Sequence, residues 1–248
     1  MHLRICDVAF PHLIHLKTTM KPLLLTSSLI LSLGTLPLSA AVVISGGHID
    51  VPAFGYDSVD GFEPHLHNEG GPDGAIVDGV REENDSEYEA DEAIIKVPLT
   101  STTSLNSVTY FWLPDNATQA SNNGTPFVGF GLEELEPTDW NGNMTLKLTG
   151  ITGPGDFLLW TYDINLDPVT LLDSNNLALS FDLPPGAHEH FNWGFTDEGI
   201  YQLTFEISGD HVTDGIVSGS GTFTFAIPEP STALLGAIGA LGLLLRRR

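Results

Sequence analysis

Cysteine is nearly absent from this 248-residue chain, since Cys6 is the only one. Cys6 lies upstream of the segment that we expect to direct export, so the predicted mature protein contains no thiol. This absence excludes disulfide bonds, thiolate metal ligands and cysteine nucleophiles from the predicted mature protein.

Lysine and arginine are also scarce in the body of the chain. Residues 42–227 contain only Arg81, Lys96 and Lys147 against 30 Asp and Glu residues, a formal charge of about −27 with histidine neutral. A surface this acidic repels phosphate backbones and anionic lipids, so we expect no nucleic-acid partner. Cations are its natural ligands, although solubility alone explains most of these carboxylates.

Sequence templates of common hydrolases are missing too. The chain has no Gly-x-Ser-x-Gly nucleophile elbow, no His-Glu-x-x-His helix and no glycine-rich phosphate loop. Glu189 stands between two histidines, but on an extended strand its side chain points to the face opposite theirs. We therefore expect that the protein is not an enzyme, and a metal-dependent hydrolase ranks third among its candidate functions.

The first part of the chain has the features of a secretory signal. Lys21 supplies a positive n-region, residues 23–36 form an apolar stretch, and residues 38–41 provide small side chains for cleavage. We interpret residues 20–41 as the signal peptide. Residues 1–19 fit no part of this scheme, and we interpret them as the product of a mis-called start, with Met20 as the true initiator.

The last part of the chain, residues 228–248, has three elements in order. They are the motif Pro228-Glu229-Pro230, an apolar run over residues 233–245 and the cluster Arg246-Arg247-Arg248. As a plain transmembrane anchor the apolar run is short for a hydrocarbon core of about 30 Å. The order of elements closely resembles the PEP-CTERM sorting signal of Gram-negative bacteria.

That resemblance implies recognition by an exosortase-type membrane enzyme. It also implies a hydrophobic helix that holds the protein in the inner membrane before processing. Delivery to the cell envelope, the cell surface or the extracellular matrix would follow.

Short alternating or β-branched runs, separated by Gly, Pro, Asn and Asp, fill the body of the chain. This punctuation predicts one all-β domain over residues 42–227, an antiparallel β-sandwich of jelly-roll or immunoglobulin-like type. The predicted strands are residues 42–45, 48–51, 93–97, 108–113, 127–132, 144–151, 157–162, 177–183, 200–208 and 216–226.

Residues 55–92 contain many Gly, Pro, Asp and Glu residues and predict a solvated surface loop, because so many like charges cannot share a core. The oxygen-rich side chains of such acidic loops suit Ca²⁺. However, the segments Asp57-Ser58-Val59-Asp60 and Asp73-Gly74 do not have the spacing of an EF-hand or a nonapeptide calcium repeat.

Histidine pairs are the most informative feature of the body. Four of its six histidines form the pairs His65-Leu66-His67 and His188-Glu189-His190. In an extended strand, residues i and i+2 point to the same face about 6.5–7 Å apart, so both imidazoles of a pair can bind one ion. The segment His48-Ile49-Asp50 has the same form and adds a carboxylate.

The histidine pairs therefore predict a transition-metal site formed by His48, His65, His67, His188 and His190 with Asp50. A set of nitrogen and oxygen donors without thiolate suits Zn, Mn, Cu(II) or Ni, and the sequence does not choose among them. His211 lies on a predicted turn and is left out of the site.

Aromatic residues fall mainly at strand positions, where core filling is their default role. Trp and Tyr side chains beside a groove can also stack on sugar rings, which makes a matrix polysaccharide a candidate partner.

Several body segments together resemble the choice-of-anchor M domain, a surface-anchored domain best known in actinobacteria. The most specific block is His188-Glu189-His190-Phe191-Asn192-Trp193-Gly194-Phe195-Thr196. The other matching segments are residues 47–50, 108–114, 127–131, 148–150, 153–160 and 199–205. The resemblance spans about residues 46–208.

Members of that family are typically secreted, carry varied anchors and in actinobacteria are often associated with a metal-type ABC transporter. The resemblance implies functional roles for His48, His188, His190, Asn192 and Trp193. This chain departs from the family in its anchor, because its tail resembles a PEP-CTERM signal rather than a sortase motif.

Two functions remain open on the sequence. The first is an exported, surface-anchored binding protein that holds a transition metal through paired histidines. The second is a structural or adhesive protein of the envelope or biofilm matrix, whose acidity provides solubility or calcium bridging. The two are distinguished by whether the five histidines other than His211 converge in space.

Overall fold

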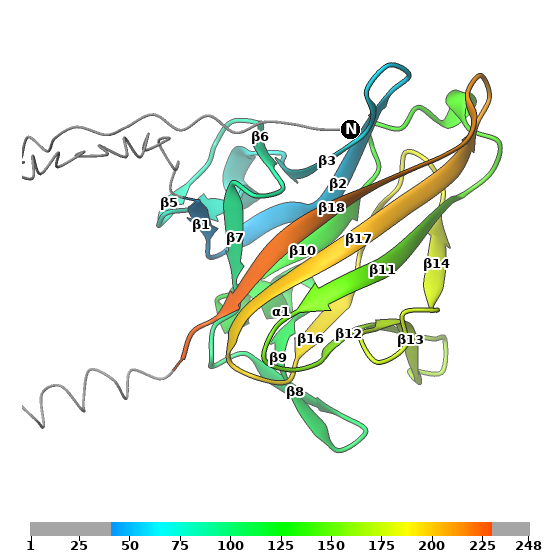
Figure 1. Ribbon diagram of the computed structural model, residues 1–248. Coiled ribbons are helices and arrows are strands. Elements are labelled where there is room, and N and C mark those ends of the chain that lie inside the picture. Colours follow the sequence, from blue (N-terminus) through cyan, green and yellow to red (C-terminus); the bar gives the residue numbers. More distant parts are fainter. Residues whose placement is uncertain (1–40, 230–248) are drawn as a thin grey trace, which may run out of the picture. The chain divides into compact units, whose positions relative to one another are not determined.

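The computed structural model describes residues 41–229, and β-strands dominate them (Figure 1). The predicted extension at 1–19, the predicted signal peptide except Ala41, and the predicted sorting helix with Pro230, Arg246, Arg247 and Arg248 lie outside the described residues. The predicted all-β, sandwich-like fold is confirmed by the three sheets of the described part. Within residues 41–229, no helix has the length and apolar character needed to cross a bilayer.

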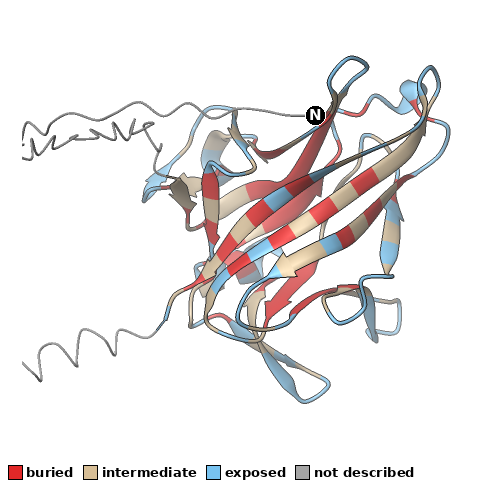
Figure 2. Ribbon diagram, in the orientation of Figure 1, coloured by how far each residue is buried: buried red, intermediate tan, exposed pale blue. Residues whose placement is uncertain are grey.

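The largest sheet has eight strands and is built around a long hairpin of β17 (Gly199–His211) and β18 (Gly215–Ile227). Buried and accessible positions alternate along both strands, as expected when one face of a sheet covers a core (Figure 2). In spatial order the strands are β14 (Ser180–Leu183), β11 (Met144–Thr152), β17, β18, β7 (Ala93–Lys96), β1 (Val42–Ile44), β4 (Ile76–Val77) and β5 (Val80–Arg81).

Two further sheets have five strands each. The order of the second sheet is β15 (His188–His190), β10 (Pro126–Gly131), β2 (Gly47–Asp57), β3 (Gly61–Asn68) and β6 (Ser86–Glu89). The order of the third sheet is β13 (Pro168–Asp173), β12 (Phe157–Tyr162), β16 (Asn192–Phe195), β9 (Val108–Leu113) and β8 (Thr102–Leu105).

Three strand pairs are parallel, which the sequence did not indicate. They are β1 with β7, β7 with β18, and β2 with β10. Parallel partners need long connections, so short turn signals cannot reveal them. The β2–β10 pair matters most for the site. It sets His48 beside β10, the strand whose other neighbour, β15, carries the second histidine pair.

Aromatic side chains from all three sheets meet in one core. Trp193 on β16 is fully buried and stacks on Phe130 of β10 at 5.3 Å and on Phe225 of β18 at 5.4 Å between ring centroids. Phe205 of β17 contacts the same ring edge-on at 5.7 Å. The shared core fixes β10 and β16 relative to the large sheet.

Residues 55–92 contain more regular structure than the predicted solvated loop. The strand β2 continues to Asp57, and β3 follows with Leu66 and Asn68 buried. Asn68 is satisfied in the interior because its amide donates to Asn84 O and Ser86 Oγ, both at 3.0 Å, while its carbonyl oxygen accepts from Ala75 N at 2.7 Å. Polar residues face inward on β3, so its sequence lacks the alternation of apolar and polar residues that would have predicted a strand.

One short helix and two 3₁₀ turns complete the described elements. The helix α1 (Ala117–Asn123) begins at Asn116, whose side chain accepts from Gln119 N at 3.1 Å, and ends at Gly124 in the left-handed region. The 3₁₀ turns are Gly71–Asp73 and Pro137–Asp139. Helix α1 packs beside β10, close to the site described next.

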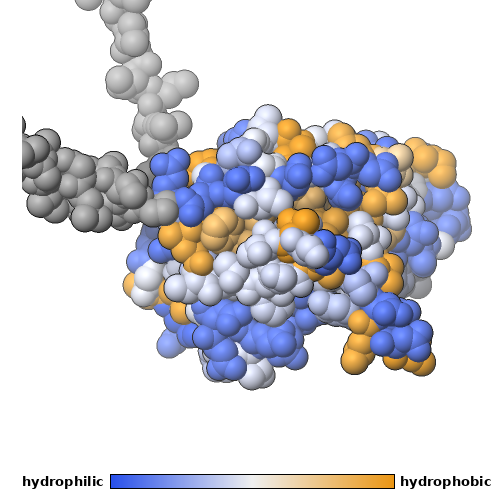
Figure 3. Space-filling view, turned by 90° about the horizontal axis from the view of Figure 1, so that it is seen from below, coloured by the Kyte–Doolittle hydropathy of each residue, from blue (hydrophilic) through white to orange (hydrophobic). Residues whose placement is uncertain are grey.

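Large apolar residues that reach solvent are scattered over turns and strand ends. The most exposed are Ile164, Val59 and Ile216. On the face seen in Figure 3, hydrophobic residues form separate patches between hydrophilic ones. That face therefore carries no continuous apolar surface.

Candidate metal centre

Three adjacent strands of the second sheet bring two sequence pairs onto one face. The strand β10 lies between β2 and β15, and Gly129 at its centre is opposite both Asp50 on β2 and His190 on β15. His48 and His188 stand two residues along their own strands, so they share this face. Long side chains from the two outer strands therefore meet above a glycine.

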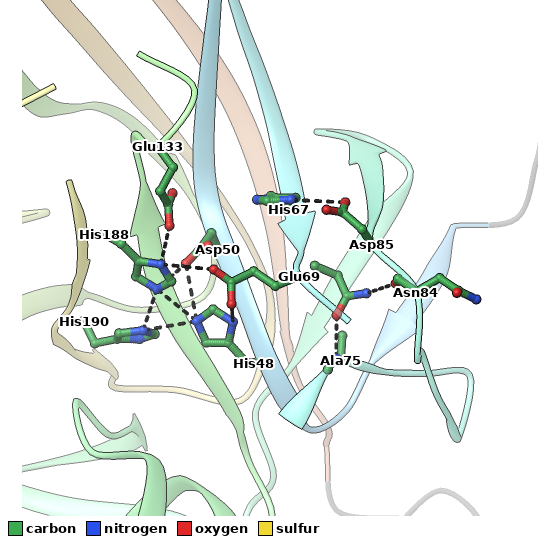
Figure 4. A network of polar contacts seen from close by, with 12 residues as sticks. His48, Asp50, His67, Glu69, Ala75, Asn84, Asp85, Glu133, His188 and His190 are labelled. Atoms are coloured by element: carbon green, nitrogen blue, oxygen red, sulfur yellow. Dashed lines mark hydrogen bonds and ion pairs between the residues drawn. The ribbon is translucent and has the colours of Figure 1, made fainter. Parts of the chain in front are cut away.

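The three imidazoles point their Nε2 atoms at one another (Figure 4). The Nε2 atoms of His48 and His188 are 3.0 Å apart, those of His48 and His190 3.2 Å, and those of His188 and His190 2.9 Å. A tetrahedral site with Zn–N bonds of 2.0–2.1 Å spaces its ligands about 3.3–3.4 Å apart. The triangle thus needs only a small expansion to surround one ion.

Asp50 completes the cluster from the interior. Its side chain is fully buried, and its Oδ1 lies 3.2 Å from His188 Nε2 and 3.7 Å from His48 Nε2. Neither carboxylate oxygen has a hydrogen-bond partner among the described residues. Burial raises the pKa of Asp50 to about 7. A buried carboxylate without a hydrogen-bond donor is costly, and a cation bound between it and the imidazoles removes that cost.

An outer carboxylate sets the tautomer of His188. Its Nδ1 donates to Glu133, so Nε2 is the nitrogen that faces the cluster and that a metal would bind once its proton is lost. This hydrogen bond is the main cause that raises the pKa of His188 to about 9. Burial pushes the pKa of Glu133 up, but the hydrogen bond from His188, a backbone hydrogen bond and the charges of His188 and His67 together lower it. Carboxylates in this position orient metal-binding histidines in many proteins.

A second outer carboxylate, Glu69, lies near two rings. Its oxygens are 3.7 Å from His188 Nδ1 and 4.0 Å from His48 Nδ1. The pKa of His48 is lowered, first by burial and then by the neighbouring charge of His188. A neutral His48 has a lone pair available for a metal.

The ring of His190 is fixed by stacking. It lies 3.6 Å from the ring of Phe127 with an interplanar angle of 6°. Burial, followed by the charge of His48, lowers the pKa of His190 to about 3. The apolar contact therefore keeps this imidazole neutral and correctly oriented for a ligand.

Two glycines on β10 make room for the cluster. A Cβ added at Gly129 would overlap Asp50 Oδ1 and lie 2.9 Å from His190 Cε1. A Cβ at Gly131 would lie 3.0 Å from both Asp50 Cβ and Glu133 Oε2. Small residues are thus required where the side chains of the flanking strands cross.

The donor set of three imidazoles and one carboxylate fits a divalent transition metal. It contains no soft sulfur ligand and too few oxygens for Ca²⁺, which takes six to eight. The three histidines line a hollow of about 360 Å³ together with Glu69, Gly70, Asp73, Ala117 and Phe127. The cluster is therefore accessible from one side, while Asp50 closes it from the other.

The structure does not bring His65 and His67 into this cluster. His65 donates from Nδ1 to Glu63 O at 3.0 Å and meets Glu134 Oε1 through Nε2 at 3.0 Å. His67 contacts Asp85 Oδ1 at 3.3 Å. With Glu87 and Glu134, His65 forms a separate group of close donor atoms on the other side of β2 from β10.

Asn192 and Trp193, which the family resemblance singles out, lie in structural positions. Asn192 accepts from Trp112 Nε1 at 2.8 Å and donates to Asp115 Oδ2 at 2.7 Å, which ties β16 to the segment before α1. Trp193 is a core residue. Their contacts position the neighbouring strands rather than the metal cluster.

Sequence reasoning missed Glu69, Phe127, Gly129 and Glu133. The alternation of glycine in Phe127-Val128-Gly129-Phe130-Gly131 is the one signal that could have marked β10 as a strand with an open face. Nothing in the sequence indicated that this face would lie between the two pairs.

Comparison with known proteins identifies only the tail. Residues 226–248 match the PEP-CTERM protein-sorting motif. Searches of curated proteins and of solved structures gave no match for this chain. The motif supports export, membrane-anchored sorting and recognition by an exosortase-type enzyme.

Proposed function

We propose that this protein is an exported binding protein that holds a transition metal ion through His48, His188, His190 and Asp50. The observation that carries the proposal is the meeting of three imidazole Nε2 atoms within 3.2 Å of one another. Three ring nitrogens that face one another repel through their lone pairs unless a proton or a cation lies between them. The buried carboxylate of Asp50, which has no hydrogen-bond partner among the described residues, favours the cation.

We infer from the tail that this binding activity operates outside the cytoplasm. Its PEP-CTERM motif supports export, and display at the cell surface or in the matrix extends that finding. The resemblance of the body to the choice-of-anchor M domain agrees with a surface-displayed protein. A metal captured there is available for delivery to a membrane transporter or for storage at the surface.

Metal analysis with a matched pair of variants tests the metal site. Untagged residues 42–227 should retain a stoichiometric transition metal, and a chelator should lower the melting temperature. A ligand at 100 times its Kd stabilises the native state by about 2.7 kcal/mol. The variant His188→Ala/His190→Ala should bind no metal and show no chelator effect.

The control is His65→Ala/His67→Ala, which removes the same residue types outside the cluster and should keep the wild-type response. An equal loss of bound metal in both double variants would contradict the proposed ligand set. A wild type that binds none of Zn, Mn, Cu or Ni would leave the structural or adhesive function. A stabilising effect of calcium that persists in both variants would indicate that the acidic loops bind the cation instead.

A further inference from the structure

The hollow above the three histidines continues into a second one. The second hollow has a volume of about 210 Å³ and shares His48, Asp73, Ala117 and Phe127 with the first. Because they share these walls, the two hollows adjoin. A molecule bound in the second hollow can reach the metal from the open side of the cluster.

Arg81 lines the second hollow and is one of three basic residues between positions 42 and 227. Its Nη1 donates to Gly74 O at 2.6 Å. No carboxylate of the described residues lies within ion-pairing distance of Arg81, although the same stretch contains 30 Asp and Glu residues. The rest of its guanidinium is therefore free to bind an anion from solution.

The other walls define the body of that anion. Ile76, Ala117, Ala120 and Phe127 present apolar surface, while Ser45, Ser121 and Thr125 add hydroxyls. A guanidinium pairs best with a carboxylate, which it binds through two parallel hydrogen bonds. The volume and the mainly apolar wall suit a small organic molecule rather than a polymer.

The carboxylates around the hollows explain why an anion would bind there only when the metal is bound. Glu69 lines the first hollow and Asp73 lines both, and these carboxylates repel an anion. A divalent ion held by neutral imidazoles and one carboxylate keeps one positive charge, so it attracts a second anionic donor. The metal and Arg81 then form two cationic ends of one continuous site.

We propose that the joined hollows bind a small organic dicarboxylate, with one carboxylate on Arg81 and the other on the metal. This inference rests on the proposed metal site. The protein would accordingly capture its metal together with a small carboxylate ligand, and the ligand would add a fifth donor on the accessible side.

Calorimetry of the full chain, purified in a mild detergent, tests the inference with phthalate and glutarate as probes and benzoate as a monocarboxylate control. The zinc-loaded wild type should bind a dicarboxylate at least tenfold more tightly than benzoate. The metal-free protein should bind neither. The variant Arg81→Gln should lose at least tenfold in dicarboxylate affinity while it retains its zinc content and melting temperature.

Two further variants keep the result decisive. Arg81→Lys retains the charge without the paired hydrogen bonds and should fall between wild type and Arg81→Gln. Lys96→Gln removes an exposed cation on β7 outside both hollows and should change nothing. Dicarboxylate binding that persists in Arg81→Gln or in the metal-free protein would overturn the inference.

Elemental analysis of each sample separates the two proposals. Zinc retained without dicarboxylate binding would refute the dicarboxylate site alone. A wild type without zinc would refute the metal site and this inference with it.

Discussion

At the scale of single residues, Asp50 has the most unusual environment of the acidic side chains described. Its carboxylate is fully buried beside three imidazoles and has no hydrogen-bond partner within residues 41–229. In the metal-free protein this carboxylate should oppose folding when it ionises. With a metal bound, the same charge becomes a ligand.

Asp50→Asn should therefore change how the stability of the metal-free protein depends on pH. The folded pKa is raised to about 7 from 3.8, so the native state holds a proton that the unfolded state releases in this window. Relative to the variant, the wild type should lose stability as the pH rises from about 4 to about 7, by an amount on the order of 4 kcal/mol. The comparison is needed because the lowered pKa of His190 acts in the opposite direction over this window in both proteins. Asn does not titrate, so the variant should lack this loss.

Urea unfolding at pH 4 and pH 8 in the presence of a chelator measures the effect. The cost of burying an amide is common to both pH values and cancels from the comparison. If the free energy of unfolding changed equally with pH in wild type and variant, the carboxylate would not be the source of the pH dependence.

At the scale of elements, the strand β10 makes room for the cluster because two of its residues have no side chain. Gly129 and Gly131 leave the space over which side chains from β2 and β15 meet. Phe127, which stacks on His190, is the large side chain that β10 contributes beside the imidazoles. A small residue at position 129 is thus as necessary as the ligands.

Gly129→Ala should weaken metal binding by at least tenfold while the protein remains folded. The added methyl would overlap Asp50 Oδ1 and press on His190, so the ligands must separate. Gly150→Ala on β11 is a suitable control, because its Cβ would meet nothing closer than Thr204 Oγ1 at 3.4 Å. Competition with a chromogenic chelator measures the zinc affinity of both variants, and thermal unfolding checks that they are folded. A Gly129→Ala variant with wild-type zinc affinity would contradict this geometry.

The elements also show what the sequence could and could not predict. Strands with clear alternation, such as β11 and β18, agree with their predicted ranges because local pattern determines them. The strand β3 was missed because His65 and Asn68 face inward and are satisfied by contacts from distant residues.

The candidate site was predicted in part for a related reason. The i and i+2 spacing placed His188 with His190 and His48 with Asp50 on common faces. Which pairs would meet depends on strand order and register, in particular the parallel pairing of β2 with β10. Local spacing holds no information on that order, so His65 and His67 could not be separated from the others.

At the scale of the whole molecule, we expect the folded body and the sorting tail to be separable. The last strand ends at Ile227, which is buried in the core, and the matched sorting motif occupies residues 226–248. The described core therefore requires Ile227 but no residue beyond it.

Deletion of residues 228–248 should release a folded protein into the medium. Its melting temperature and metal content should equal those of the body prepared from the full chain. Cell fractionation and thermal unfolding measure the two properties. Replacing Pro228, Glu229 and Pro230 by alanine keeps the length of the tail and should also disturb sorting. Misfolding of the deletion variant, or its retention in the envelope, would contradict a purely sorting role.

The edge position of β15 would affect the rate at which a bound ion leaves. Two of the three imidazoles stand on this three-residue strand, which pairs with β10 on one side only. Such an edge can detach briefly while the rest of the sheet stays closed. The residence time of the metal would then reflect the frequency of this local opening rather than the global stability of the domain. A partner that adds a strand at this edge would lengthen the residence time, and one that displaces β15 would unload the ion.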